Sequence, residues 1–166
     1  MVKRPSKSSN GQSPSDEQRA RVLLVDEDAS DLDRYSGMLR YFGYEVWSVG
    51  SYSRAASSLG RERFDLIIIE QGSADFQGRA VLTRAVEIDR RVPVLVFTRV
   101  LDVDCCLEAL DIGACEYVQK PLTSTEFRDL VSDYSKAPMR GFSVGQGGLL
   151  RHLSSGGGRE KADISL

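Results

Sequence analysis

Three short runs of the sequence are wholly apolar, and they restrict the possible folds more than any other feature. The runs cover residues 22–25, 66–69 and 94–97 and consist mostly of valine, leucine and isoleucine. A strand that is covered on both faces gives such a continuous run, whereas a strand with one face in water alternates apolar and polar residues. Shorter strand candidates lie at residues 46–49 and 117–118. The sequence therefore predicts five strands, with the apolar runs inside a sheet.

Between these runs, apolar residues recur every three or four positions, which is the spacing of an amphipathic helix. The predicted helical faces lie within residues 32–42, 55–59, 81–88, 106–110 and 127–134. Ser30 is the expected N-cap of the first helix, and Gly43 is its expected C-terminal stop. Thr123 and Glu126 have the spacing of a capping box for the last helix. Strand and helix patterns therefore alternate five times.

This alternation predicts an α/β fold. Strands that are separated by helices pair in parallel and are joined by right-handed crossovers. Five such units within residues 20–136 fit a flavodoxin-like, doubly wound, five-stranded parallel sheet of order 2-1-3-4-5. Residues 1–19 are rich in serine and residues 137–166 are rich in glycine, so both are predicted to be flexible tails of this one domain.

The charge distribution argues against a protein that binds nucleic acid. The formal net charge is -2, and residues 1–19 and 137–166 each carry +2, so residues 20–136 carry -6. No apolar run approaches the roughly 20 residues that a membrane-spanning helix needs, and no secretory signal precedes the domain. Cys105, Cys106 and Cys115 have neither zinc-ligand spacing nor an even count for disulfides. We expect a cytoplasmic protein that does not contact a membrane.

Polar residues gather where the predicted strands end. Asp26 and Glu27 follow the first strand, Glu70 ends the third, Thr98 ends the fourth, and Lys120 follows the fifth. All of these positions face the same edge of a parallel sheet, so the side chains can converge. Three carboxylates at short range require a cation, which could be the Lys120 ammonium or a Mg²⁺ ion. This edge of the sheet could therefore bind an acidic ligand through a bridging metal ion, or a protein carboxylate could take the place of that ligand.

These features resemble the receiver domain of bacterial two-component response regulators, over roughly residues 20–135. The resemblance is carried by residues 21–28, 64–70, 94–98 and 113–121, together with Gly78 in the loop after the third strand. It implies that Asp26, Glu27 and the backbone carbonyl of Gly72 would bind Mg²⁺, although metal is not required. It also implies a Lys-Pro peptide bond, before Pro121, that is usually cis.

The resemblance also implies roles for the other strand-end residues. Glu70 stands at the position of the phosphate-accepting aspartate, Thr98 and Lys120 would contact the phosphoryl oxygens, and Tyr117 would switch between exposed and buried rotamers. The departure at Glu70 has the largest consequence. A glutamate is about 1.5 Å longer, and a shift of about 1 Å can slow a transfer reaction on the order of a hundredfold. Arg99, next to Thr98, could pair with Glu70, close the entrance, or point away.

Three hypotheses follow for the state of this site. Glu70 could mimic the phosphorylated form by reaching Thr98 and Lys120. The site could instead be silent, so that the domain is a fixed binding platform. Phosphate could still be accepted by Glu70 or by a nearby aspartate such as Asp75. A small Mg²⁺-dependent phosphoryl-transfer enzyme is the alternative class, but the sequence lacks a glycine-rich phosphate loop and a nucleophile elbow.

The favoured function is a stand-alone, non-enzymatic protein-interaction module, since residues 137–166 are too few for an output domain. The expected partner is a signalling protein or histidine kinase, with a homodimer as an alternative. The expected docking face is formed by the fourth helix, the fifth strand and the fifth helix, and includes Asp104, Glu108, Asp111, Tyr117 and Arg128. The tail contains a second possible contact, a group of apolar residues that could form a short helix on binding or could be loop filler: Phe142, Val144, Leu149, Leu150 and Leu153.

Overall fold

Five parallel strands form the sheet in the order β2-β1-β3-β4-β5. The computed structural model describes residues 19–135. The strands are β1 (Arg21–Val25), β2 (Glu45–Val49), β3 (Leu66–Glu70), β4 (Val94–Thr98) and β5 (Glu116–Gln119). The helices are α1 (Ala29–Tyr41), α2 (Tyr52–Leu59), α3 (Arg79–Ile88), α4 (Val103–Ile112) and α5 (Ser124–Ser135). The predicted fold class and strand order are confirmed, and the predicted tails lie outside the described residues.

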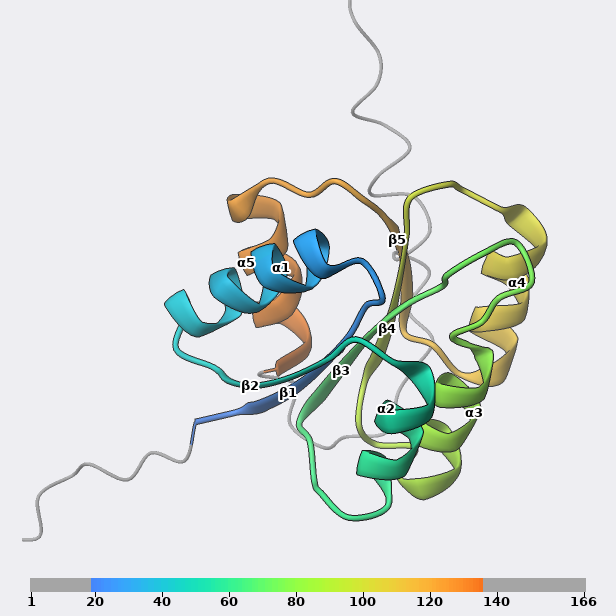
Figure 1. Ribbon diagram of the computed structural model, residues 1–166, viewed down its shortest axis with the longest axis horizontal. Coiled ribbons are helices and arrows are strands. Elements are labelled where there is room, and N and C mark those ends of the chain that lie inside the picture. Colours follow the sequence, from blue (N-terminus) through green and yellow to red (C-terminus); the bar gives the residue numbers. More distant parts are fainter. Residues whose placement is uncertain (1–18, 136–166) are drawn as a thin grey trace, which may run out of the picture.

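The sheet lies between two groups of helices (Figure 1), and it separates two apolar layers. On one face, Leu23 and Ile67 pack under α2, α3 and α4. On the other face, Leu24 and Ile68 pack under α1 and α5. Because successive side chains of a strand point to opposite faces, a strand in the middle of two layers must be apolar at every position. This explains why β4 is buried throughout.

Local hydrogen bonds fix the ends of the helices. The N-cap of α1 is Asp28, not Ser30 as the sequence predicted, because the Asp28 carboxylate accepts hydrogen bonds from the backbone N–H groups of Ser30 and Asp31. The capping box before α5 is confirmed: the backbone N–H of Thr123 donates to Glu126 Oε2 and that of Glu126 donates to Thr123 Oγ1. No helix of residues 19–135 is both long and apolar enough to cross a bilayer.

Gly78 marks the tightest backbone contact in the loop that follows β3. A Cβ atom at this position would lie only 2.4 Å from the backbone oxygen of Glu70. The N–H of Gly78 donates to the backbone oxygen of Gln71 at 3.0 Å. The missing side chain therefore lets the start of α3 close against the end of β3, and this contact fixes the path of the loop beside the strand ends.

We expect Gly78→Ala to lower the free energy of unfolding by about 1–3 kcal/mol, because the added methyl group overpacks the contact with Glu70. Gly37→Ala is the matched control, since nothing lies within 4 Å of a Cβ at that position in α1. Alanine there should raise the free energy of unfolding by about 0.5–1 kcal/mol. Urea unfolding measures both. Equal effects of the two substitutions would contradict the role given to Gly78.

Candidate functional site

The ammonium group of Lys120 is surrounded by carboxylates from three different parts of the chain. Its Nζ atom lies 2.9 Å from Asp26 Oδ2, 2.7 Å from Asp31 Oδ2 and 3.0 Å from Glu70 Oε1. The Lys120 side chain is only 3% exposed. Burial alone would lower the pKa of Lys120, but the hydrogen bonds to the three carboxylates raise this pKa above its ordinary value. Lys120 is therefore a fixed positive charge at the centre of the site.

Strand order explains why these groups meet. Asp26 directly follows β1, Glu70 is the last residue of β3, and Lys120 directly follows β5 beside the cis bond to Pro121. The expected convergence of Asp26, Glu70 and Lys120 is therefore present at one edge of the sheet. Asp31 was not predicted as a member of this group. Its only signal in the sequence is its place in the first turn of α1, directly after the acidic residues that follow β1.

Arg99 connects the loop after β4 to the start of α1. Its Nη2 atom lies 3.0 Å from Asp28 Oδ2 and 2.8 Å from Asp31 Oδ2. The Asp31 oxygen is thus shared by Lys120 and Arg99. Of the alternatives left open by the sequence, the pair with Glu70 is not formed, because the guanidinium binds α1 instead. The side chain is 53% exposed, so each pair stabilises the fold little, and its main effect is to hold the loop beside α1.

Two effects raise the pKa of Glu70 to about 7. Burial is the larger, since it disfavours the charged form, and the neighbouring Asp26 carboxylate adds to it. The Lys120 ammonium acts in the opposite direction but does not cancel them. The carboxyl group of Glu70 is therefore harder to ionise than an aspartate or glutamate in water.

The two residues expected to act as a switch are bonded elsewhere. The hydroxyl of Thr98 donates to the backbone oxygen of Val100 at 2.7 Å and accepts from the Val100 N–H at 3.2 Å. Within residues 19–135 it forms no hydrogen bond with Glu70. The hydroxyl of Tyr117, which is half-buried, donates to the side-chain oxygen of Gln71. Glu70 therefore makes only one of the two contacts that a mimic of phosphate was expected to make.

The expected carboxylate ligands of a metal ion have unequal surroundings. Asp26 is buried, and its Oδ1 atom accepts a hydrogen bond from the backbone N–H of Asp28 while its Oδ2 atom faces Lys120. Glu27 is exposed. Within residues 19–135, no three carboxylate, thiol or imidazole side chains are arranged to hold a metal ion. Any cation here would thus need backbone oxygens or water in addition to these carboxylates.

Gly72, whose carbonyl is the third expected ligand, occupies a backbone position that requires glycine. Its φ angle is +83°, and a Cβ atom would lie 2.8 Å from the hydroxyl oxygen of Tyr52. That Tyr52 hydroxyl is the only buried side-chain nitrogen or oxygen without a hydrogen-bond partner in the described part of the chain. Burial, followed by the negative charge of Glu70, raises its pKa. The donor set of two carboxylates and a carbonyl fits Mg²⁺ in kind.

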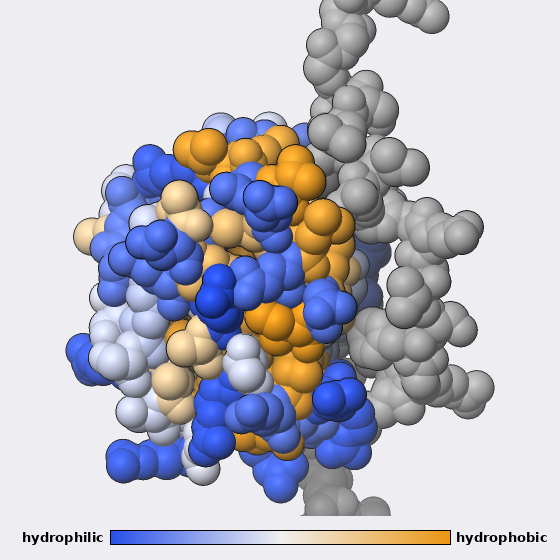
Figure 2. All heavy atoms as spheres, turned by 90° about the vertical axis from the view of Figure 1, so that its right-hand side faces the viewer, coloured by the Kyte–Doolittle hydropathy of each residue, from blue (hydrophilic) through white to orange (hydrophobic). Residues whose placement is uncertain are grey.

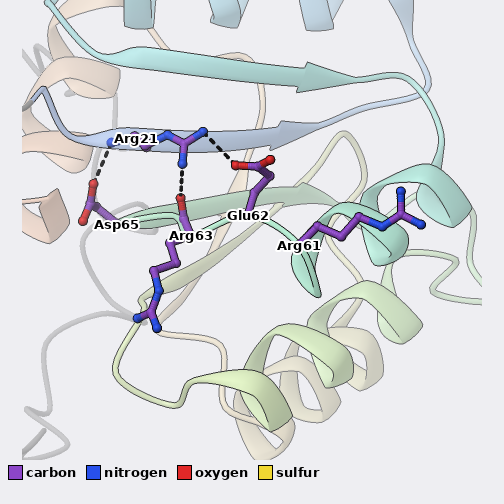
Figure 3. A pocket seen from close by; sticks show the side chains of 5 residues that line it. All are labelled: Arg21, Arg61, Glu62, Arg63 and Asp65. Carbon is purple, nitrogen blue, oxygen red and sulfur yellow. Dashed lines mark hydrogen bonds and ion pairs between the residues drawn. The ribbon is translucent and has the colours of Figure 1, made fainter.

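A pocket of about 580 Å³ lies at the opposite edge of the sheet (Figure 3). It is lined by residues at the start of β1 and before β3: Arg21, Arg61, Glu62, Arg63 and Asp65. Arg21 pairs with Glu45 at 3.1 Å and with Glu62 at 3.2 Å. The pocket lies at the amino-terminal ends of the strands and is therefore remote from Lys120 and its carboxylates, the strand-end site. Arg21, which lines the pocket, already has protein partners.

A second surface begins at Val100, the residue after Arg99. Figure 2 shows apolar side chains gathered over this face of the molecule. Seven large apolar side chains are exposed within residues 19–135, and four of them lie in residues 100–107. We call this region the α4 surface. It consists of four apolar residues and two exposed aspartates: Val100, Leu101, Val103, Leu107, Asp104 and Asp111. Of the other residues expected on the docking face, Glu108 pairs with Arg79 and Arg128 with Asp129.

Comparison with known protein families accounts for most of the described chain. Residues 22–132 match the family described as the response regulator receiver domain. The chain belongs to this receiver family. The predicted family is thus confirmed, and the molecule is a receiver domain of two-component signal transduction.

Its curated relatives are longer regulators. The receiver is 32% identical over 116 residues to the transcriptional regulatory protein ZraR of Escherichia coli K12, which covers 70% of this chain and 26% of ZraR. It is 31% identical over 122 residues to the response regulator protein FleR of Pseudomonas aeruginosa, which covers 74% of this chain and 26% of FleR. The matched part is therefore about a quarter of these relatives.

Solved receiver structures have the same fold. A CheY-like receiver from Methanospirillum hungatei matches with a TM-score of 0.67 and 22% identity, over 70% of this chain and 94% of that one. The receiver of a LuxO repressor protein from Vibrio parahaemolyticus matches with a TM-score of 0.64 and 25% identity, over 71% of this chain and 91% of that one. The resemblance therefore covers nearly the whole of each solved domain.

We expect the Glu70 side-chain carboxyl to titrate with a midpoint near pH 7, because burial and Asp26 oppose its ionisation. Its ¹³C chemical shift reports this directly. Asp26→Asn should lower the midpoint, and Lys120→Met should raise it. Since the folded-state pKa lies above the unfolded value near 4.5, the contribution of Glu70 to stability is complete below pH 4.5 and is lost as pH rises to 7. A midpoint near 4.5 in the wild-type chain would contradict this account.

Proposed function

We propose that this receiver is a protein-docking module whose output does not depend on phosphorylation of residue 70. The observation that carries the proposal is the occupancy of Lys120. Its ammonium is already bonded to Asp26, Asp31 and Glu70. A phosphoryl group on residue 70 would have to displace these carboxylates from their shared cation. A partner such as a signalling protein or a histidine kinase would then recognise a surface that is already formed.

The geometry around the acceptor position supports the same conclusion. Arg99 is paired with Asp28 and with Asp31, which also pairs with Lys120. The Thr98 hydroxyl is bonded to Val100, so it is not free to bind a phosphoryl oxygen. Asp75, the alternative acceptor, is exposed in the loop after β3, and no ion pair joins it to Lys120 within residues 19–135. Among the hypotheses raised by the sequence, the fixed platform therefore agrees best with the contacts.

The docking face fits protein recognition. Interface centres are rich in apolar side chains, and the α4 surface exposes Val100 and Val103 at 73% each and Leu107 at 58%. Single exposed apolar residues need no explanation, but a contiguous group indicates an interaction site. We assign the partner-binding face to α4, β5 and α5, with the α4 surface at its centre. Pairing of two copies through this face is the alternative to a separate partner.

Two further features belong to this proposal. Asp26, Glu27 and the Gly72 carbonyl would hold a Mg²⁺ ion if one binds. The ion would offset the excess negative charge beside Lys120, but docking does not require it.

We place the module in the cytoplasm, since all three cysteines are free thiols and cytosolic thiols stay reduced.

We expect acetyl phosphate with Mg²⁺ to leave the wild-type chain unmodified, because Lys120 is already paired with three carboxylates and the Glu70 side chain is longer than the aspartate of the family. Intact-mass spectrometry and amide shifts of α4 in the presence of beryllofluoride provide the readouts. Glu70→Asp is the control that restores the shorter acceptor. A phosphoryl adduct on the wild-type protein, or beryllofluoride shifts in α4, would refute the proposal.

A second test asks whether the charge of Glu70 matters for docking. Affinity capture with wild type, Glu70→Asp, Glu70→Ala and Glu70→Gln should recover the same partners in equal amounts. Leu107→Ser, which removes an apolar side chain from the α4 surface, should reduce recovery, whereas Ile88→Ser on exposed α3 should not. If only the alanine and glutamine variants lost the partners, Glu70 would act as a mimic of phosphate and the fixed platform would be wrong.

A further inference from the structure

The α4 surface combines apolar side chains with uncompensated negative charge. Asp104, Leu107 and Asp111 are spaced three and four residues apart, so they lie on one face of the helix. Both aspartates are exposed, and neither forms an ion pair within residues 19–135. A ligand for this surface should therefore offer apolar side chains and positive charge together.

One segment of this chain has that composition. Residues 136–153 contain six apolar side chains larger than alanine. The same residues include Lys136, Arg140 and Arg151 and no aspartate or glutamate. Residues 1–18 are less suitable, because after Met1 and Val2 they contain no large apolar residue and they include two acids. The charge and the apolar content of residues 136–153 are thus complementary to the α4 surface.

The described part of the chain ends at Ser135, so the connection to residues 139–153 has to pass around the domain to reach α4. β5 is the edge strand, with α4 packed on one face of the sheet and α5 on the other. The hydroxyl of Ser135, the last described residue, hydrogen-bonds to the hydroxyl of Tyr44. Tyr44 lies just before β2, so this contact is at the amino-terminal ends of the strands, whereas Lys120 lies at their carboxyl ends. Leu149 is fourteen positions after Ser135, which is roughly 46 Å of extended chain. A domain of about 120 residues has a radius of gyration of roughly 13 Å, so a connection of this length can pass from the end of α5 to α4.

We propose that residues 139–153 bind the α4 surface of the same chain. This inference rests on the proposed function, because it names an occupant for the docking face. Leu149 and Leu150 cover Val103 and Leu107, and Arg140 and Arg151 face Asp104 and Asp111. Because the segment belongs to the same chain, its effective concentration at the α4 surface is on the order of millimolar, so a weak contact suffices. The segment and an external partner then compete for one face.

The test compares full-length ¹⁵N-labelled chains by NMR. Relative to wild type, Leu149→Ser/Leu150→Ser should shift the backbone amides of α4 and leave those of α1 unchanged. Ile164→Ser is the matched control, since it removes an apolar side chain outside the segment, and it should shift neither helix. The proposal is overturned if the α4 amides are the same in wild type and in the double variant.

Charge and stoichiometry provide independent checks. The amide ¹H–¹⁵N NOE of Leu149 and Leu150 should fall in Asp104→Lys/Asp111→Lys and should persist in Glu87→Lys, which changes an exposed acid on α3. The wild-type α4 shifts should not change on dilution. Shifts that depend on concentration would make a second copy the occupant and would overturn the proposal. These measurements need no external partner and test only whether residues 139–153 bind the α4 surface. The acetyl phosphate experiment tests only residue 70, so the segment proposal and the proposed function can fail independently.

Discussion

The buried ammonium of Lys120 is the interaction on which the arrangement of the strand ends depends. Three carboxylates share it, and each comes from a different element of the fold. Removal of a buried charge from water costs several kcal/mol, and only close, well-formed ion pairs offset that cost. The carboxylates would repel one another without the ammonium, and the ammonium would not remain charged without them. The loop after β1, the end of β3 and the start of α1 are therefore held together by a single cation.

Sequence patterns were sufficient for the fold because each one has a single physical cause. The run at residues 66–69 is apolar at every position since both sides of β3 are covered. The helix between each pair of strands then dictated parallel pairing, and parallel pairing dictated which end of the sheet holds Asp26, Glu70 and Lys120. The error at the first N-cap was local. Ser30 and Asp28 are both good capping residues, and the extended backbone and accepting carboxylate of Asp28 distinguish them.

The site was less predictable because side-chain direction is decided by near neighbours. Asp31 could have faced solvent, but the α1 turn that Asp28 caps directs it toward Lys120 and Arg99. The Thr98 hydroxyl could have bonded to Glu70, but the tight turn after β4 brings the backbone N–H and C=O of Val100 to it instead. Residue types and strand order therefore located the site, whereas the choice of hydrogen-bond partners within it required coordinates.

The connection between β4 and α4 places both surfaces of the receiver in four consecutive residues. Thr98 and Arg99 contact the strand-end site, and Val100 and Leu101 begin the α4 surface. A ligand that moves the backbone of Val100 must break the hydrogen bonds of the Thr98 hydroxyl, and a group that attracts this hydroxyl must release Val100. Such effects are reciprocal, since each event changes the equilibrium of the other by the same free energy. A partner that moved Val100 on binding the α4 surface would thus also change the surroundings of the Thr98 hydroxyl, with no need for a covalent modification.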